Sequence, residues 1–159
     1  MTVGVPTCPP DTRLVDLVRL MLEKNWEAVV VLDGEEGHAL GVVGQDELVK
    51  AYEREEARTL TAEQVMREGV PQVPPDIPLA VAAQMMIDQK VRAFFLMHNA
   101  GGVTYPAAMI TYRHLMRHLA AQSDDDLKDM GIAAARKAPL EQFIERRDAA
   151  KRAADNRKK

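Results

Sequence analysis

Four side chains in the second half of the sequence have the chemistry that a phosphate group needs. Arg92 and Arg113 can donate charge-assisted hydrogen bonds, Thr111 carries a hydroxyl, and His114 has ring nitrogens that can donate. Thr111 stands directly before a predicted helix that begins at Tyr112, where backbone N–H groups converge. The alternative is that both arginines are solvated and that Thr111 only caps this helix. The sequence therefore supports phosphate recognition by these four residues as a hypothesis.

Other reactive groups give weaker signals. His114 and His118 have the four-residue spacing that can chelate a transition metal on a helix, but no third ligand is evident, and we interpret both as solvent-exposed. Cys8 has no basic neighbour in sequence, so we expect a small buried hydrophobe rather than a reactive thiolate. No nucleophile–base pair or phosphate-cradling glycine loop is evident, and we expect no enzymatic activity.

Composition narrows the class of protein. The 159 residues are 47% hydrophobic and 28% charged, with a net charge of −3, which argues against a nucleic-acid-binding protein. No apolar run approaches the roughly 20 residues that span a bilayer. The N-terminus lacks a secretory signal, and one cysteine excludes an intrachain disulfide framework. We expect a cytoplasmic protein that does not enter membranes.

An internal repeat organises the chain. Residues 4–33 align with residues 69–98 at an offset of 65, with nine identities in thirty positions. Seven of them fall in the block 4–14, which returns as 69–79. A repeat of this length indicates one supersecondary unit built twice. We call residues 1–60 the first unit and residues 61–121 the second unit.

Each unit predicts the same order of elements. In the first, Asp11 is the expected N-cap of a helix that ends near residue 25. Apolar runs over 28–32 and 39–43 predict two strands, and a closing helix follows. In the second, Asp76 is the expected cap, strands are predicted over 93–97 and 107–110, and a helix over 112–121 closes the unit. The two closing helices align at an offset of 67 instead of 65. This difference places two extra residues of the second unit in the turn around Gly102.

This arrangement resembles the tandem CBS-domain pair, also called the Bateman module, over residues 3–121. Residues 61–66 are similar to the lead-in that precedes the second domain of such pairs, and residues 91–96 to its characteristic strand. The family closes each unit with a Gly-apolar-apolar-Thr-x-x-Asp-Leu motif. The corresponding segments here are Gly41-Val42-Val43-Gly44-Gln45-Asp46-Glu47-Leu48 and Ala108-Met109-Ile110-Thr111-Tyr112-Arg113-His114-Leu115.

The resemblance implies an α+β fold in which two units pack about a pseudo-twofold axis and form two clefts. Such clefts commonly bind AMP, ADP, ATP or S-adenosylmethionine. The base lies between the entry segment and a strand edge, the motif hydroxyl meets phosphate, and the motif acid accepts hydrogen bonds from the ribose. The candidate ligand-binding residues are therefore Thr7, Ala28, Val30, Gly44, Glu47, Gln72, Arg92, Ala93, Phe95, Thr111, Arg113 and His114.

The sequence departs from the family motif in both units. In the first cleft, defined by Gly44 and Glu47, the hydroxyl is missing and the acid is one methylene longer. In the second cleft, defined by Thr111 and His114, the hydroxyl is kept and histidine replaces the acid. We assign Arg92 and Arg113 to the second cleft. Phe95 either stacks on a base or fills the cleft.

Two functions remain open at this point. The first is a non-catalytic regulatory module that senses an adenine nucleotide, needs no cofactor and acts on a separate protein. The second is a degenerate pair that has lost nucleotide binding and serves as a dimerisation or docking scaffold. The resemblance implies a homodimer in either case. The segment 122–159 is predicted to be a helical tail, and from residue 134 it carries nine Lys or Arg against four acids.

Overall fold

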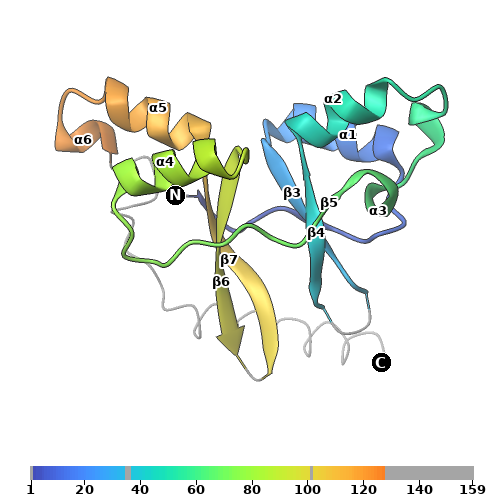
Figure 1. Cartoon of the computed structure of the whole chain (residues 1–159), viewed down its shortest axis with the longest axis horizontal. Helices are drawn as coiled ribbons and strands as arrows, with labels where there is room; N and C mark the ends of the chain where they lie inside the picture. Colours follow the sequence, from blue (N-terminus) through green and yellow to red (C-terminus); the bar gives the residue numbers. More distant parts are fainter. Residues whose placement is uncertain (1, 35–36, 101, 128–159) are drawn as a thin grey trace, which may run out of the picture.

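The computed structural model describes residues 2–34, 37–100 and 102–127. Two sheets stand side by side, and the helices of both units lie toward the same end of the strands (Figure 1). The elements in chain order are β1 (Thr2–Val3), β2 (Thr7–Cys8), α1 (Leu14–Lys24), β3 (Ala28–Leu32), β4 (Ala39–Gly44), α2 (Gln45–Tyr52), the 3-10 helix η1 (Ala57–Thr59), α3 (Ala62–Val65), β5 (Arg67–Glu68), α4 (Leu79–Asp88), β6 (Ala93–Ala100), β7 (Val103–Thr111), α5 (Tyr112–Ala120) and α6 (Asp124–Leu127).

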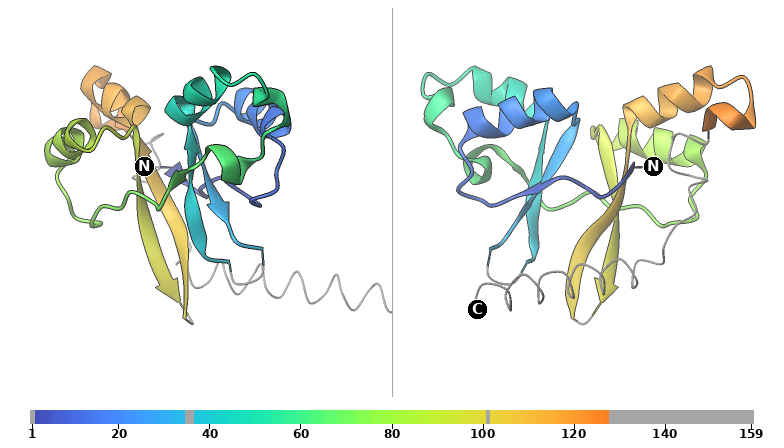
Figure 2. Two further views of the ribbon diagram at one scale, coloured as in Figure 1. Left: turned by 45° about the vertical axis from the view of Figure 1, so that its right-hand side comes forward. Right: turned by 180° about the vertical axis from the view of Figure 1, so that it is seen from behind.

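The units exchange their leading strands. One sheet has the order β2-β3-β4-β5 and the other β1-β7-β6. β5 leads into the second unit but pairs with β4 of the first, with Arg67 opposite Val42. β1 leads into the first unit but pairs with β7 of the second, with Thr2 opposite Met109. Figure 2 shows the N-terminal segment crossing from one sheet to the other. Each sheet is therefore completed by the other unit.

The repeat is confirmed at atomic detail. Thr7 pairs in parallel with Val30, and Gln72 pairs in parallel with Phe95, at the same offset of 65. The N–H of Val30 donates to the carbonyl of Pro6 at 3.0 Å, and the N–H of Phe95 donates to the equivalent proline carbonyl at 2.8 Å. The entry segment of each unit is thus held against its first buried strand.

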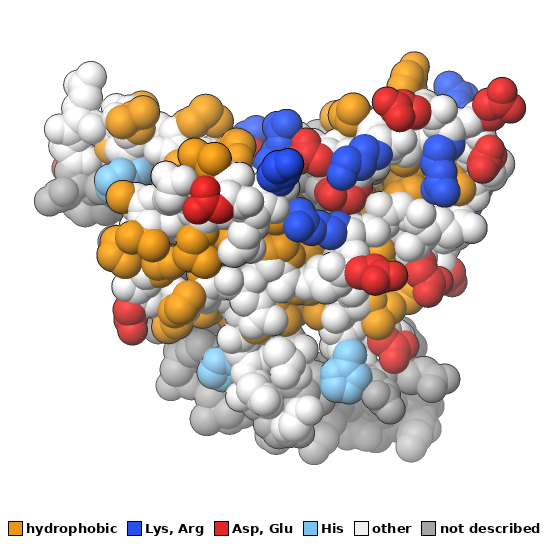
Figure 3. Space-filling model, in the orientation of Figure 1, with side chains coloured by type: hydrophobic (Ala, Val, Ile, Leu, Met, Phe, Trp, Pro, Cys, Tyr) orange, Lys and Arg blue, Asp and Glu red, His pale blue; other side chains and the backbone are white. Residues whose placement is uncertain are grey.

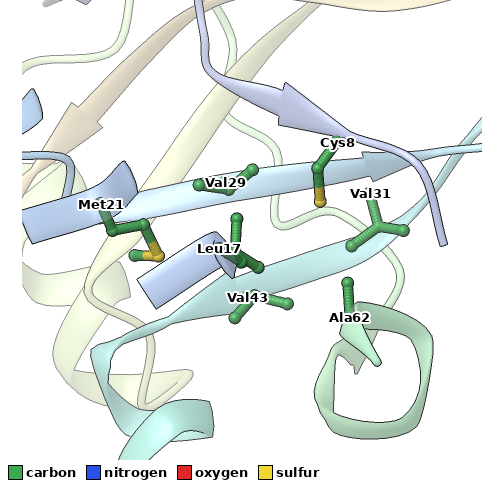
Figure 4. Close-up of a cluster of buried hydrophobic side chains, with 7 residues drawn as sticks. All are labelled: Cys8, Leu17, Met21, Val29, Val31, Val43 and Ala62. Carbon is green, nitrogen blue, oxygen red and sulfur yellow. The ribbon is translucent and has the colours of Figure 1, made fainter. Parts of the chain in front are cut away.

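The described residues form four apolar clusters, three of which show how the units are built and joined. One lies mainly in the first unit, where Leu17 and Met21 of α1 pack on the inward side chains of β3 and β4, and Ala62 of α3 closes it (Figure 4). A second lies inside the second unit around Phe94 and Met86. A third joins the units, because β3 and β4 supply Ala28, Val30 and Val42 while β6 and β7 supply Ala93, Phe95 and Met109. The interface between the units is therefore itself a hydrophobic core.

Gly41 in β4 is required by close packing. A Cβ at this position would lie 2.3 Å from the carbonyl oxygen of Arg67 in β5 and 2.8 Å from the sulfur of Met66. Real Cβ atoms do not come so near a backbone oxygen, so only glycine lets β5 pair here. The same position in the second unit is Ala108, which lies opposite Val3 of β1.

Some predicted boundaries were wrong. α1 and α4 are N-capped by Arg13 and Pro78 rather than by Asp11 and Asp76, because the extended backbone continues two residues further, through the bridge between Arg13 and Thr61 in the first unit. β6 extends to Ala100 and β7 begins at Val103, so both strands are longer than predicted. The two extra residues of the second unit therefore lie in paired strands and not in a longer turn. The predicted tail begins at residue 122, and its part from 128 to 159 lies outside the described residues. None of the helices within the described residues has the length and apolar character needed to cross a bilayer.

Candidate functional site

The first cleft opens where β4 ends and α2 begins. Gly44 is the N-cap of α2, and its N–H donates to Oε2 of Glu47 at 3.1 Å. The acid therefore folds back over the helix start, in the capping-box geometry. A side chain at Gly44 would be close to this carboxylate, since its Cβ would lie 3.1 Å from Glu47 Oε2. The missing motif hydroxyl thus leaves room for the acid to swing in.

A pocket lies at this helix start, between the two units. Its volume is about 40 Å³. The first unit contributes carboxylates and the second unit contributes cations, which gather at the boundary between the units in Figure 3. The lining residues are Glu27, Ala28, Val42, Gly44, Gln45, Asp46, Glu47, Arg67, Pro71, Lys90, Val91, Arg92 and Ala93.

Arg92 belongs to the first cleft. Its Nε lies 2.8 Å from Oδ1 of Asp46, on the first turn of α2. Its guanidinium also lies 5.9 Å from the centroid of the Tyr112 ring, within cation–π distance. The grouping of Arg92 with Thr111 is corrected accordingly, because the side chain crosses from the second unit to the helix of the first. Arg67 lies nearby and donates to the carbonyls of Gln89 and Lys90 at 3.4 and 3.3 Å.

The second cleft begins at the start of α5, and its polar groups bind one another. The N–H of Thr111 donates to Nδ1 of His114 at 3.0 Å, and the Thr111 hydroxyl donates to Oε2 of Glu27. Thr111 is 1% exposed and His114 is 8% exposed. Burial, and after it positive charges including Arg117 and Arg113, lower the pKa of His114 to about 4. His114 is therefore neutral at pH 7, with the proton on Nε2 because Nδ1 accepts the bond.

Arg113 ties the second unit to the first. Its Nη2 donates to Oδ1 of Asn25 at 3.1 Å, and its Nε lies 3.8 Å from Oε1 of Glu27. Arg113 is therefore not simply a solvated side chain, because it contacts two residues of the first unit. Sequence reasoning did not single out Asn25 or Glu27. The repeat held a signal, because Glu27 aligns with Arg92 at offset 65 and Asp46 aligns with Arg113 at offset 67.

The interpretation of His114 as solvent-exposed was wrong. Its ring is packed at the start of α5, and its Nδ1 accepts the hydrogen bond of the Thr111 N–H. His118 is exposed on the same helix. Among the described residues, no group of three or more His, Cys, Asp or Glu side chains could hold a metal ion. Cys8 is buried as expected, and burial raises the pKa of its thiol, which keeps the sulfur protonated.

The apolar candidates divide into two groups. Ala28 and Ala93 line the pocket beside α2. Val30 and Phe95 are each 0% exposed in the core between the units, so neither presents a face to a base in this structure. Thr7 and Gln72 are exposed at equivalent places on the two entry segments. Of the two options for Phe95, the structure shows that it fills the space between the units.

Comparison with protein families decides the class of fold. A family model described as CBS domain matches the chain twice, over residues 1–54 and 62–121. The chain belongs to the CBS domain family. The matched ranges follow the two units, separated near η1. A comparison with curated proteins found no match.

Solved CBS structures share this fold at low sequence identity. The CBS-domain containing protein ATU1752 from Agrobacterium tumefaciens is 21% identical, with a TM-score of 0.60 over 69% of this chain and 79% of that one. The CBS domain pair of protein MJ0100, solved with 5-methylthioadenosine and S-adenosyl-L-methionine, is 15% identical, with a TM-score of 0.65 over 77% and 94%. The CBS domain protein PAE2072 from Pyrobaculum aerophilum, complexed with AMP, is 14% identical, with a TM-score of 0.60 over 84% and 95%.

The two clefts of this CBS pair differ in how their polar groups are paired. The first keeps an acid at a helix N-terminus, an arginine within reach and a pocket between the units. In the second, the hydroxyl and the arginine both contact Glu27. The geometry therefore favours the first cleft as the candidate ligand site.

Proposed function

We propose that this CBS pair is a regulatory module that binds an adenine nucleotide, such as AMP, ADP, ATP or S-adenosylmethionine, in the first cleft. The observation that carries the proposal is the pocket between the units, where Glu47 lies at the start of α2 and Arg92 reaches in from the second unit. Two structural relatives are complexes with adenosine-containing ligands.

Each group in this cleft has a role that follows from its chemistry. The Glu47 carboxylate accepts hydrogen bonds from both ribose hydroxyls. The free N–H groups of the first turn of α2 and the Arg92 guanidinium take the phosphate, for which Arg92 exchanges Asp46 for the ligand. Ala28, Ala93 and Val42 offer the apolar surface against which the base packs. The N-terminal end of α2 favours a ligand with negative charge.

The size of the pocket suggests how binding is transmitted. About 40 Å³ is far below the roughly 300 Å³ or more of typical ligand sites, so a nucleotide must separate the walls that the two units contribute. Binding thereby selects a different packing of the units. A partner protein that recognises one packing would then respond to the nucleotide.

A thermal-shift series tests this proposal. The purified protein is heated with AMP, ADP, ATP or S-adenosylmethionine at millimolar concentration. A ligand present at 100 times its dissociation constant adds about 2.7 kcal/mol to the free energy of unfolding. We expect at least one nucleotide to raise the melting temperature by several degrees.

A matched pair of variants locates the site. Glu47→Gln keeps an oxygen for the Gly44 N–H but removes the charge, and we expect it to weaken nucleotide binding at least tenfold. Glu53→Gln changes the same charge at the exposed far end of α2 and should leave binding unchanged. No shift with any nucleotide, or equal binding by both variants, would contradict the proposal.

Exposed apolar side chains on the helices support the second candidate function, a dimerisation or docking scaffold. Large apolar side chains are exposed along the helices of both units, and those over α4 and α5 are visible in Figure 3. Leu119 on α5 is 87% exposed and Tyr52 on α2 is 86% exposed. Exposed apolar patches on helices mark protein–protein contact surfaces. We propose that a second copy of the chain covers this helical side.

Light scattering on a sizing column checks the dimer. We expect the wild-type mass to equal two chains at micromolar concentration. Leu119→Glu places a charge in the contact and should shift the mass toward one chain. Asn99→Glu, on the exposed end of the β6–β7 hairpin, is the control and should remain dimeric. A wild-type protein that elutes as one chain at every concentration rules out this arrangement.

A further inference from the structure

The two clefts contain equivalent ion pairs with the charges reversed. Arg92 and Glu27 occupy the same position in the repeat, immediately before β6 and β3. Each side chain crosses to the closing helix of the other unit, where Arg92 meets Asp46 and Glu27 meets Arg113. The residue that arrives is thus a cation in the first cleft and an anion in the second.

The arriving anion uses the groups that a phosphate would use. The Thr111 hydroxyl donates to one oxygen of Glu27, and Arg113 Nε lies 3.8 Å from the other. The remaining contact of Arg113 is with Asn25, at 3.1 Å. The Glu27 side chain is only 21% exposed, so it lies within the cleft and not above it. A carboxylate of this chain therefore already sits where the hydroxyl and the guanidinium converge.

A phosphate entering the second cleft would meet an unfavourable field. Like charges in a partly buried site repel each other more strongly than in water, since the surrounding dielectric is lower. His114 offers no compensating charge at neutral pH, because its pKa is about 4. Arg113 already faces Glu27 and Asn25. In the first cleft, whose pocket wall also includes Glu27, the arriving residue is an arginine.

We propose that Glu27 is a built-in anionic occupant of the second cleft, so that the chain takes a phosphorylated nucleotide in the first cleft alone. Glu27 is then a specificity-determining residue that sets the number of nucleotides at one per chain. This inference rests on the proposed function, because it presumes that the clefts of this CBS pair are nucleotide sites.

Titration calorimetry with AMP tests the inference through the binding ratio. We expect the wild-type protein to bind one AMP per chain. Glu27→Ala frees Thr111 and Arg113 for phosphate and is expected to bind two AMP per chain. Glu23→Ala removes an equally negative but exposed side chain four residues earlier on α1, and its ratio should stay at one. Combining Glu27→Ala with Arg92→Ala should leave one site, now in the second cleft.

The outcomes separate this inference from the proposed function. Two AMP per wild-type chain overturns it, and so does a folded Glu27→Ala protein that still binds one. If Glu27→Ala does not give a cooperative unfolding transition, Glu27→Gln decides, because it keeps the size of the side chain and removes the charge. If the wild type binds neither AMP nor any other ligand of the thermal-shift series, the first-cleft proposal fails. The role of Glu27 as occupant of the second cleft is then decided by Glu27→Ala alone, which must gain a site that the wild type lacks.

Discussion

Replacing Phe95 with alanine should lower the free energy of unfolding by about 3–5 kcal/mol. Its ring is fully buried and packs between β3 and β4 of one unit and β7 of the other. The substitution removes this apolar surface and leaves a cavity at the interface between the units. Urea unfolding followed by circular dichroism measures the loss. A change below about 1 kcal/mol would show that the interface collapses around the cavity.

Phe94→Ala provides the comparison. Phe94 is equally buried but packs inside the second unit. We expect a similar loss of stability, but with the units still unfolding in one transition. Phe95→Ala should instead broaden the transition or split it, because it weakens the contact that makes the units cooperative. Identical transition shapes for the two variants would argue that other contacts, including the exchanged strands, maintain cooperativity.

The second large effect is a pH dependence carried by His114. The folded protein holds its pKa at about 4, whereas the ring titrates near 6.5 in the unfolded chain. Between pH 6.5 and pH 4 the His114 ring is therefore protonated in the unfolded state and neutral in the folded state. The contribution of this residue is complete above pH 6.5 and is lost as the pH falls toward 4. The loss amounts to about 3 kcal/mol at pH 4.

Unfolding free energies measured from pH 7 to pH 4 for the wild type and His114→Gln isolate this effect from that of the carboxylates. Glutamine keeps the capping geometry, as Gln64 does when its Oε1 accepts the N–H of Thr61 at 2.9 Å. We expect the loss of unfolding free energy between pH 7 and pH 4 to be smaller in His114→Gln than in the wild type by about 3 kcal/mol. His118→Gln, on the exposed side of the same helix, should follow the wild-type curve. Parallel curves for wild type and His114→Gln would contradict the buried neutral ring.

The fold was largely readable from the sequence. The repeat located both units, and the apolar runs located β3, β4, β6 and β7, because strands buried on both faces must be continuously apolar. The helix caps were harder. Asp11 and Asp76 are better capping residues than Arg13 and Pro78, yet backbone pairing keeps the chain extended past them. Tertiary pairing overrode local preference there.

The site was harder to predict than the fold. Motif spacing identified Glu47 and Thr111, since both lie in the closing segment of their own unit. It could not show that Arg92 crosses to Asp46, or that Glu27 crosses to Thr111. These contacts join residues of different units, and their geometry follows from how the units dock. Comparing aligned positions for opposite charge, rather than for identity, would have been the useful signal.

The exchange of β1 and β5 bears on how the chain can be divided. A fragment cut between the units would retain one leading strand with no partner and expose a strand edge that β5 or β1 had covered. Unpaired edges recruit other chains. Two copies of one isolated unit could satisfy each other, with the leading strand of each copy completing the sheet of the other. In the present chain the covalent link between the units supplies both missing strands within one molecule.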